Sequence, residues 1–291
     1  MQVQYLFLVG AAVLLTVDFA LNKTYQKLKG ISPAAVFAFN SLIGLFTAII
    51  FFVINSFRAD FSIYSFIMAA LVNVLVMCYS IIGFRLLNTG TMALYTLFLM
   101  SGGMVVPYIF GMLFLGEPFS ALKAIALILI LAGVILPNAN NEKINTGQIA
   151  MCITVFILNG FVSVVSKLHQ IEIRFDTVNA TDFVLLGGVF KFVFAGILYL
   201  FARRSFANIT ETKTKITPII IIVASATAGG ISYFLQLFGA ASLPATVLYP
   251  FVTGGSIVFS SLAGIIFFKD KLSKNVIASI ILCFLGTILF L

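Results

Sequence analysis

Five charged side chains lie within long apolar runs of this chain: Asp18, Lys23, Arg85, Lys167 and Lys191. A charge at the centre of a bilayer costs about 2.5–3.5 kcal/mol on insertion scales, so such a group is a candidate for binding a polar ligand. Lys23 and Arg85 lie near the ends of their runs, where a long side chain can also reach the interface. Asp18 lies deeper, where it could bind substrate or pair with a lysine.

Polar side chains recur at helical spacing within the same runs. Asn159, Ser163 and Lys167 follow one another by four residues, and Asp18 and Asn22 have the same spacing, so each set shares one face of a helix. Further polar residues in apolar runs are Asn73, Gln236, Tyr249 and Thr253. All of these side chains are predicted to line a cavity that binds substrate. The alternative, strongest for the hydroxyl groups, is helix–helix packing, where small and polar residues also concentrate.

The sequence contains little that points to covalent or metal chemistry. Three cysteines, Cys78, Cys152 and Cys283, lie in separate apolar runs without metal-ligand spacing and are expected to be small buried side chains. The one histidine, His169, is expected in an interfacial loop, with a proton relay as the alternative. No nucleophile–base pair or phosphate-binding loop is recognisable. We therefore predict no metal, no cofactor and no enzymatic activity.

The composition indicates an integral membrane protein. Hydrophobic residues make up 62% of the chain and charged residues 9%, whereas a soluble domain is about half apolar and a quarter charged. The net charge of +8 lies in short gaps between apolar runs, so the expected partner is the lipid bilayer rather than nucleic acid. Ten continuous runs have about the length of a membrane helix. They are 4–27, 33–56, 62–86, 90–115, 119–136, 147–169, 181–201, 217–239, 244–268 and 273–291.

The two halves of the chain repeat each other. "FLGEPFSALKAIALILILAGVIL" at 114–136 aligns with "FFKDKLSKNVIASIILCFLGTIL" at 267–289, an offset that pairs Gly133 with Gly286. "NKTYQ" and "SKLHQ" pair Lys23 with Lys167 in the same way. The predicted units are 1–136 and 147–291, joined by a polar linker at 137–146. Because each unit has an odd number of spans, the second must insert upside down, which is the plan of many secondary transporters.

These motifs resemble the drug/metabolite transporter superfamily, in its ten-span EamA-like branch. The likeness rests on Lys23 in "LNKTYQ", Lys167 in "VSKLHQ", the "LGEPFS…LILAGVIL" turn and the span count. The family commonly has Arg-Phe within span two, where this chain reads Asn40-Ser41, and the second Gly-Glu turn has become Lys269-Asp270. The second-half counterpart "FKF" keeps a cation, Lys191, for which the resemblance implies a packing or pairing role.

The resemblance implies export or exchange of small metabolites through a cavity lined by both halves. The predicted function is therefore secondary transport of a small polar or amphipathic metabolite by alternating access, with a proton or a counter-substrate as a possible coupling partner. The protein is expected in the cell membrane, specifically a bacterial inner membrane. The alternative is a polytopic membrane enzyme or scaffold. The substrate and the oligomeric state do not follow from the sequence.

Structural roles are predicted for Glu117, Gly133 and Gly286. A carboxylate near a helix N-terminus is favoured by the helix dipole, and Glu117 directly precedes span five. Glu117 is therefore predicted to hold the turn between spans four and five rather than to bind substrate.

The distribution of cations predicts the orientation in the membrane. Arg58, Lys123, Lys167 and Arg174 follow even-numbered spans, and twelve of the other cations follow odd-numbered ones. The positive-inside rule then places both termini outside the cytoplasm, whereas the family resemblance implies the reverse. We expect the orientation given by the positive-inside rule, with both termini outside the cytoplasm. Reporter fusions at Leu291, one active only in the cytoplasm and one only outside, will test this, and a cytoplasmic signal would contradict it.

Overall fold

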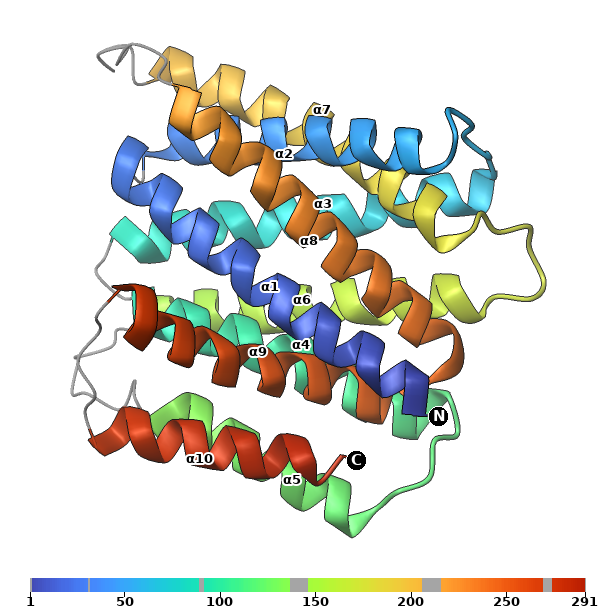
Figure 1. The fold of residues 1–291 in the computed structure, drawn as a ribbon, viewed down its shortest axis with the longest axis vertical. Helices are drawn as coiled ribbons and strands as arrows, with labels where there is room; N and C mark the ends of the chain where they lie inside the picture. Colours follow the sequence, from blue (N-terminus) through green and yellow to red (C-terminus); the bar gives the residue numbers. More distant parts are fainter. Residues whose placement is uncertain are drawn as a thin grey trace.

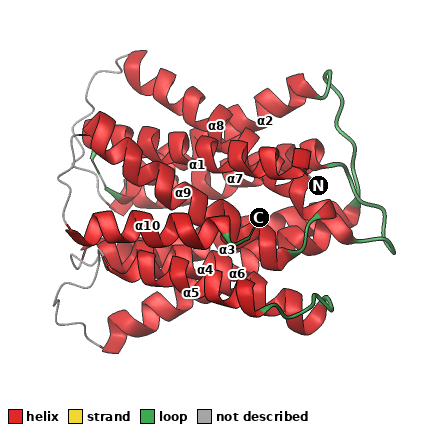
Figure 2. Cartoon of the chain, turned by 60° about the horizontal axis from the view of Figure 1, so that its bottom comes forward, coloured by secondary structure: helices red, strands yellow, loops and turns green. Residues whose placement is uncertain are grey.

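A computed structural model describes residues 2–30, 32–88, 92–136, 146–205, 216–268 and 274–290. The described residues form ten α-helices joined by short connections (Figures 1 and 2). The helices of the first half are α1 (Gln2–Lys29), α2 (Pro33–Ile54), α3 (Ile63–Asn88), α4 (Met92–Phe114) and α5 (Ala121–Ile135). Those of the second half are α6 (Thr146–Ile171), α7 (Ala180–Ser205), α8 (Ile216–Ser242), α9 (Ala245–Phe268) and α10 (Lys274–Ile288).

The prediction of an all-helical fold is confirmed, and each helix overlaps one predicted span. Within the described residues, seven helices are long and apolar enough to cross a membrane: α1, α2, α3, α6, α7, α8 and α9. The described apolar parts of α4, α5 and α10 are shorter, at Phe98–Phe114, Ala121–Ile135 and Ile277–Ile288. Ten membrane spans therefore remain a prediction. Several residues named above lie outside the described part of the chain: most of the linker, Lys269, Asp270 and Leu291.

Local signals in the sequence set several helix boundaries. The Ser32 hydroxyl accepts a hydrogen bond from the Ala35 amide, and Pro33 occupies the first turn of α2, where its missing N–H costs nothing. Ser120 caps α5 in the same way, by accepting from the Lys123 amide. Gly116, with φ of +67°, makes the turn that ends α4.

The helices cross the bundle in alternating directions, so both termini lie on one face (Figure 1). The connections after α2, α4, α6 and α8 lie on this face, which we call the terminal face. The odd-numbered helices end on the opposite face.

Helix pairing is similar in the two halves. Helix α1 packs on α8 and α9, and correspondingly α6 packs on α3 and α4. Helix α2 packs on α7, α4 on α9 and α5 on α10, so these three pairs each join a helix to its own counterpart. Exchanging the first five helices with the last five therefore leaves the main pairings unchanged.

The contact between α5 and α10 is reciprocal at the level of single residues. A β-carbon at Gly133 would lie 2.6 Å from the Cys283 sulfur, and one at Gly286 would lie 2.7 Å from Cγ1 of Ile130. Cys283 is the residue that the 153-residue offset pairs with Ile130. Gly133 therefore contacts Cys283, and its counterpart Gly286 contacts Ile130, which is the counterpart of Cys283. The absent glycine side chains let the two helices pack closely.

The contact between α2 and α7 has the same form. A β-carbon at Gly44 would lie 2.7 Å from the Gly188 carbonyl oxygen, and one at Gly188 would lie 2.8 Å from the Ala48 amide nitrogen and 2.9 Å from the Gly44 carbonyl oxygen. A β-carbon at Gly44 would also meet the amide nitrogen of Phe192. Phe192 is the counterpart of Ala48 in the second half, since both Gly44 with Gly188 and Ala48 with Phe192 are 144 residues apart. The two backbones are in direct contact here.

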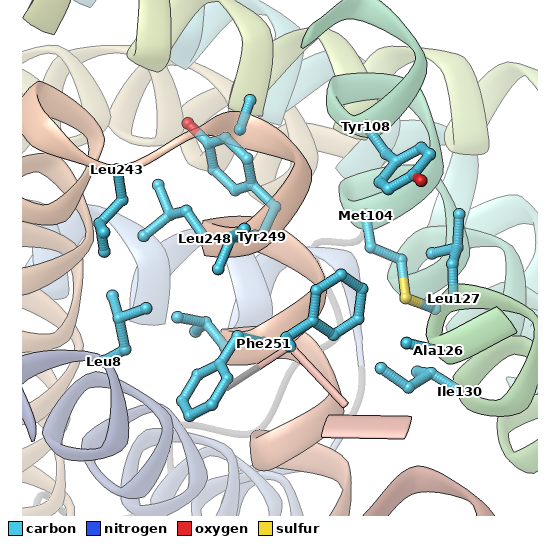
Figure 3. Packing of buried hydrophobic residues seen from close by; sticks show 14 of the residues in the cluster. Leu8, Met104, Tyr108, Ala126, Leu127, Ile130, Leu243, Leu248, Tyr249 and Phe251 are labelled. Atoms are coloured by element: carbon cyan, nitrogen blue, oxygen red, sulfur yellow. The ribbon is translucent and has the colours of Figure 1, made fainter. Parts of the chain in front are cut away.

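The largest buried apolar cluster lies where α1, α4, α5 and α9 meet. Figure 3 shows Leu8, Met104, Ile130 and Leu248 converging from these four helices, and each of them is fully buried. The interior therefore joins both halves of the chain instead of forming one core in each.

Substituting Gly188 with alanine tests the backbone contact. Gly188→Ala should destabilise the protein by about 1–3 kcal/mol, because the new methyl group would meet backbone atoms that cannot move aside. Gly187→Ala is the matched control, since its β-carbon would lie 3.7 Å from the Asn73 amide nitrogen, an ordinary contact. Thermal unfolding in detergent measures both. Equal melting temperatures for the two variants would contradict the packing argument.

Candidate functional site

Helix α6 presents two of the predicted polar residues to α4. The Asn159 amide donates to the Leu99 carbonyl at 2.7 Å, and the Ser163 hydroxyl donates to the Gly103 carbonyl at 3.3 Å. The helices approach closely because Gly102 has no side chain, and its β-carbon would overlap the backbone of Phe156. This polar face therefore joins the two halves.

Two tyrosines extend the polar contacts from α6 to α8 and α9. The Tyr249 hydroxyl donates to the Ser163 carbonyl at 2.6 Å, and the hydroxyls of Tyr233 and Ser166 lie 2.8 Å apart. Tyr249 and Ser166 are almost completely buried. Figure 3 shows the Tyr249 ring on the α9 segment that follows Leu248. Tyr233 was not among the predicted site residues, although its spacing of three from Gln236 on one helix could have indicated it.

Lys167 binds the C-terminal end of α8. Its ammonium donates to the carbonyls of Ala240 at 2.6 Å and Leu243 at 2.7 Å, and only 5% of the residue is exposed. Carbonyls at a helix C-terminus lack partners within the helix, and the dipole favours a cation there. Lys167 is therefore a buried cation that caps the C-terminal end of a helix.

Glu117 binds the N-terminal end of α9 rather than the start of α5. Its two carboxylate oxygens accept from the amides of Ala245 at 2.6 Å and Thr246 at 2.8 Å. The predicted turn between spans four and five is capped instead by Ser120. Gly111 makes room for the carboxylate, since a β-carbon there would lie 2.7 Å from Oε2. The sequence signal identified a carboxylate at a helix N-terminus but not which helix.

Asp18 forms a second polar cluster between α1, α7 and α8. The Ser225 hydroxyl donates to its carboxylate, and a β-carbon at Gly229 would lie 3.2 Å from the carboxylate carbon. Lys191 on α7 is close enough for an electrostatic interaction with Asp18. Among the described residues, Asp18 and Lys191 do not form an ion pair within 4 Å.

Other predicted site residues bond within their own helices. Asn73 is buried and donates to the Ala69 carbonyl, and Gln236 donates to the Ser232 carbonyl. Asn22 accepts from the Gln26 amide in the same way. Lys23 is exposed, and Thr253, which is partly buried, accepts from Ser256 through its carbonyl. The hydrogen bonds described for Asn73, Gln236, Asn22 and Thr253 do not link them to Asn159, Ser163, Lys167 or Tyr249.

His169 lies in α6 and not in an interfacial loop. Only 1% of it is exposed, its ring stacks on Phe183 at 3.8 Å between centroids, and its Nε2 lies 2.8 Å from the Ser65 hydroxyl. Ser65 also accepts from the Val178 amide and is completely buried. A serine next to a histidine is a nucleophile–base arrangement in principle, and here both side chains are buried between helices. The pair joins α3, α6 and the start of α7.

The connection after α6 is held by a charged turn. Glu172 accepts from the Arg174 amide at 2.7 Å, from the Ile173 amide at 3.1 Å and from Nε of Arg174 at 3.3 Å. The Arg174 backbone amide, followed by its guanidinium, lowers the pKa of Glu172 from its ordinary value. The turn therefore carries a carboxylate at neutral pH.

Two cavities lie at the terminal face. One, of about 430 Å³, is lined by residues from both ends of the chain and from the α8–α9 turn, including Gln4, Lys123, Pro244 and Phe290. The other, of about 340 Å³, is polar and is lined by Asn55, Asp60, Asn179 and Asp182. Neither contains Asp18, Lys167 or Tyr249. Within the described residues, no three His, Cys, Asp or Glu side chains are grouped to hold a metal.

Comparison with known proteins shows the fold alone. No protein-family model matches the chain, and no curated protein sequence matches it. A solved structure described only as "Crystal structure of protein" superposes with a TM-score of 0.72 over 97% of this chain and 94% of its own. Its sequence is 15% identical, so the arrangement of helices is shared while the function is not indicated.

Lys167→Met should destabilise the protein more than Lys23→Met. The first change leaves two buried carbonyls of α8 without their donor, at a cost of about 1–3 kcal/mol each. Lys23 occupies the equivalent position in the repeat but is exposed, which makes it the matched control. Thermal unfolding in detergent gives the comparison. A Lys167→Met protein as stable as Lys23→Met would rule out a capping role.

Proposed function

We propose that this chain is a secondary transporter of the cell membrane that exports or exchanges a small polar or amphipathic metabolite by alternating access. In this proposal all ten helices cross the membrane, and the two halves are inverted repeats. The substrate passes between the halves, near the middle of the bilayer.

The observation that carries the proposal is the equivalence of the two halves in packing. The main helix pairings are unchanged when the halves are exchanged, and the α2–α7 and α5–α10 contacts are reciprocal glycine contacts. A bundle with such internal symmetry has a second conformation, in which the first half takes the conformation of the second half and the second takes that of the first. Interconversion of two such arrangements exposes a midplane site to each side in turn.

The buried polar groups provide the second line of support. Asp18, Ser225 and Lys191 lie within helices that are long and apolar enough to cross a membrane. Ser163, Lys167 and Tyr249 bond across helices. Ionisable groups at such depth commonly belong to substrate or ion pathways. Asp18 is the best candidate among them for direct contact with substrate, because among the described residues its charge is not in an ion pair within 4 Å.

Purified protein in liposomes tests transport. A thermal-shift screen with alanine, citrate, uridine and choline selects the class that stabilises the protein, and counterflow of that radiolabelled compound is then measured. Saturable counterflow is expected for one class. Asp18→Asn should lower its rate about tenfold, equivalent to about 1.4 kcal/mol, while Asp60→Asn, in an exposed loop, should leave it unchanged. Absence of counterflow with all four compounds would count against the proposal, and equal rates in the two variants would remove Asp18 from the site.

A further inference from the structure

The turn between α8 and α9 is held at both helix ends by side chains of opposite charge. Lys167 donates to the carbonyls of Ala240 and Leu243, where α8 ends. Glu117 accepts from the amides of Ala245 and Thr246, where α9 begins. Each charge faces the end of the helix dipole that favours it, and such charge-assisted hydrogen bonds are stronger than neutral ones.

The two charged groups come from different parts of the chain. Glu117 belongs to the connection between α4 and α5 in the first half, and Lys167 belongs to α6 in the second. The turn that they hold lies on the terminal face (Figure 1). Moving α4 and α5 away from α9 at this face would therefore break both hydrogen bonds of the Glu117 carboxylate.

Most of the contact is buried, whereas Glu117 itself is partly exposed. Lys167 is 5% exposed, Thr246 1% and Tyr249 6%. Ser163 lies one helical turn further from the terminal face than Lys167, and its carbonyl binds Tyr249. Tyr249, which lies one turn after the α9 amides that Glu117 binds, thus connects the held turn to Ser163.

The closed arrangement also contains an unsatisfied group. The Thr246 hydroxyl is buried and has no hydrogen-bond partner among the described residues. A buried hydroxyl without a hydrogen-bond partner is unfavourable, because it has given up its bonds to water. The Glu117 contact therefore stabilises the closed face while the neighbouring Thr246 side chain opposes it, as expected of a contact that must open.

We propose that the Glu117 carboxylate is an electrostatic latch that keeps the terminal face closed and that releases when the bundle opens to that side, while Lys167 holds the other end of the same turn in place. The proposal rests on the transport function proposed above, of which it names one conformational step. A contact with only a structural role would add stability to the whole fold. A latch shifts the balance between the two faces, so its loss opens one face and closes the other.

Cysteine reporters on each side of the bundle distinguish these roles. With Cys78, Cys152 and Cys283 replaced by alanine, Ser163→Cys reports the terminal side and Asn22→Cys, two turns from the end of α1, reports the opposite side. Alkylation by a membrane-impermeant fluorescent maleimide is followed in detergent micelles. This readout needs no substrate and no defined membrane orientation.

Glu117→Gln should raise the labelling rate at position 163 by on the order of tenfold and lower the rate at position 22. Thr246→Val should do the opposite, because it keeps the side-chain shape while removing the unsatisfied hydroxyl. It should also raise the melting temperature. Asp176→Asn, which changes an exposed carboxylate in the α6–α7 connection, is the control and should change neither rate.

Faster labelling at both positions in Glu117→Gln would indicate general loosening and overturn the latch. Unchanged labelling in a folded Glu117→Gln protein would overturn it as well. If Glu117→Gln does not fold, Thr246→Val decides, and an unaltered rate at position 163 in that variant refutes the proposal. Counterflow is measured on the protein without reporter cysteines, with and without Glu117→Gln, so reciprocal labelling without counterflow in either would reject the transport function and leave the latch standing.

Discussion

Direct contact between helix backbones is the constraint on which the rest of this structure depends. In a bilayer, which we propose as the surroundings of this bundle, apolar side chains gain little by leaving lipid for another helix, so association relies on close packing and polar contacts. Gly44 and Gly188 let α2 and α7 touch through their main chains, and Gly133 and Gly286 do the same for α5 and α10. Both contacts join a helix to its own counterpart. The symmetry of the bundle therefore depends on four positions that tolerate no side chain.

Where closely packed helices end, their terminal backbone groups are buried and need hydrogen-bond partners. The last carbonyls and first amides of a helix have no partners within it, and burying them unpaired is costly. At the α8–α9 turn this cost is offset by full charges, Lys167 on the carbonyls and Glu117 on the amides. Elsewhere a serine hydroxyl is enough, as Ser32 and Ser120 show. The charged solution brings a carboxylate of the first half to a helix of the second, and so couples a capping contact to the relation between the halves.

The polar residues of the apolar helices therefore have different structural roles, which their residue types alone do not distinguish. Asn73 and Gln236 bond to their own helices, Asn159 and Tyr249 bond to neighbouring helices, and Asp18 faces Lys191 without a close ion pair. Asp18 and Lys191 are the oppositely charged groups among these residues. His169, whose type suggests proton chemistry, is instead packed against Phe183 and Ser65 and joins three segments of the bundle.

The sequence by itself determined the helices and the correspondence between the halves. Apolar runs and prolines are local signals, and the offset that pairs Gly133 with Gly286 is visible without coordinates. It also indicated that Glu117 serves a helix N-terminus. Only the tertiary structure decided that this helix is α9, that Lys167 caps α8, and that Ser65 meets His169 across 104 positions of the chain. The reason is physical: a helical repeat specifies which face a side chain occupies, but the partner on that face depends on how separate helices cross, and that is set by packing between segments far apart in sequence.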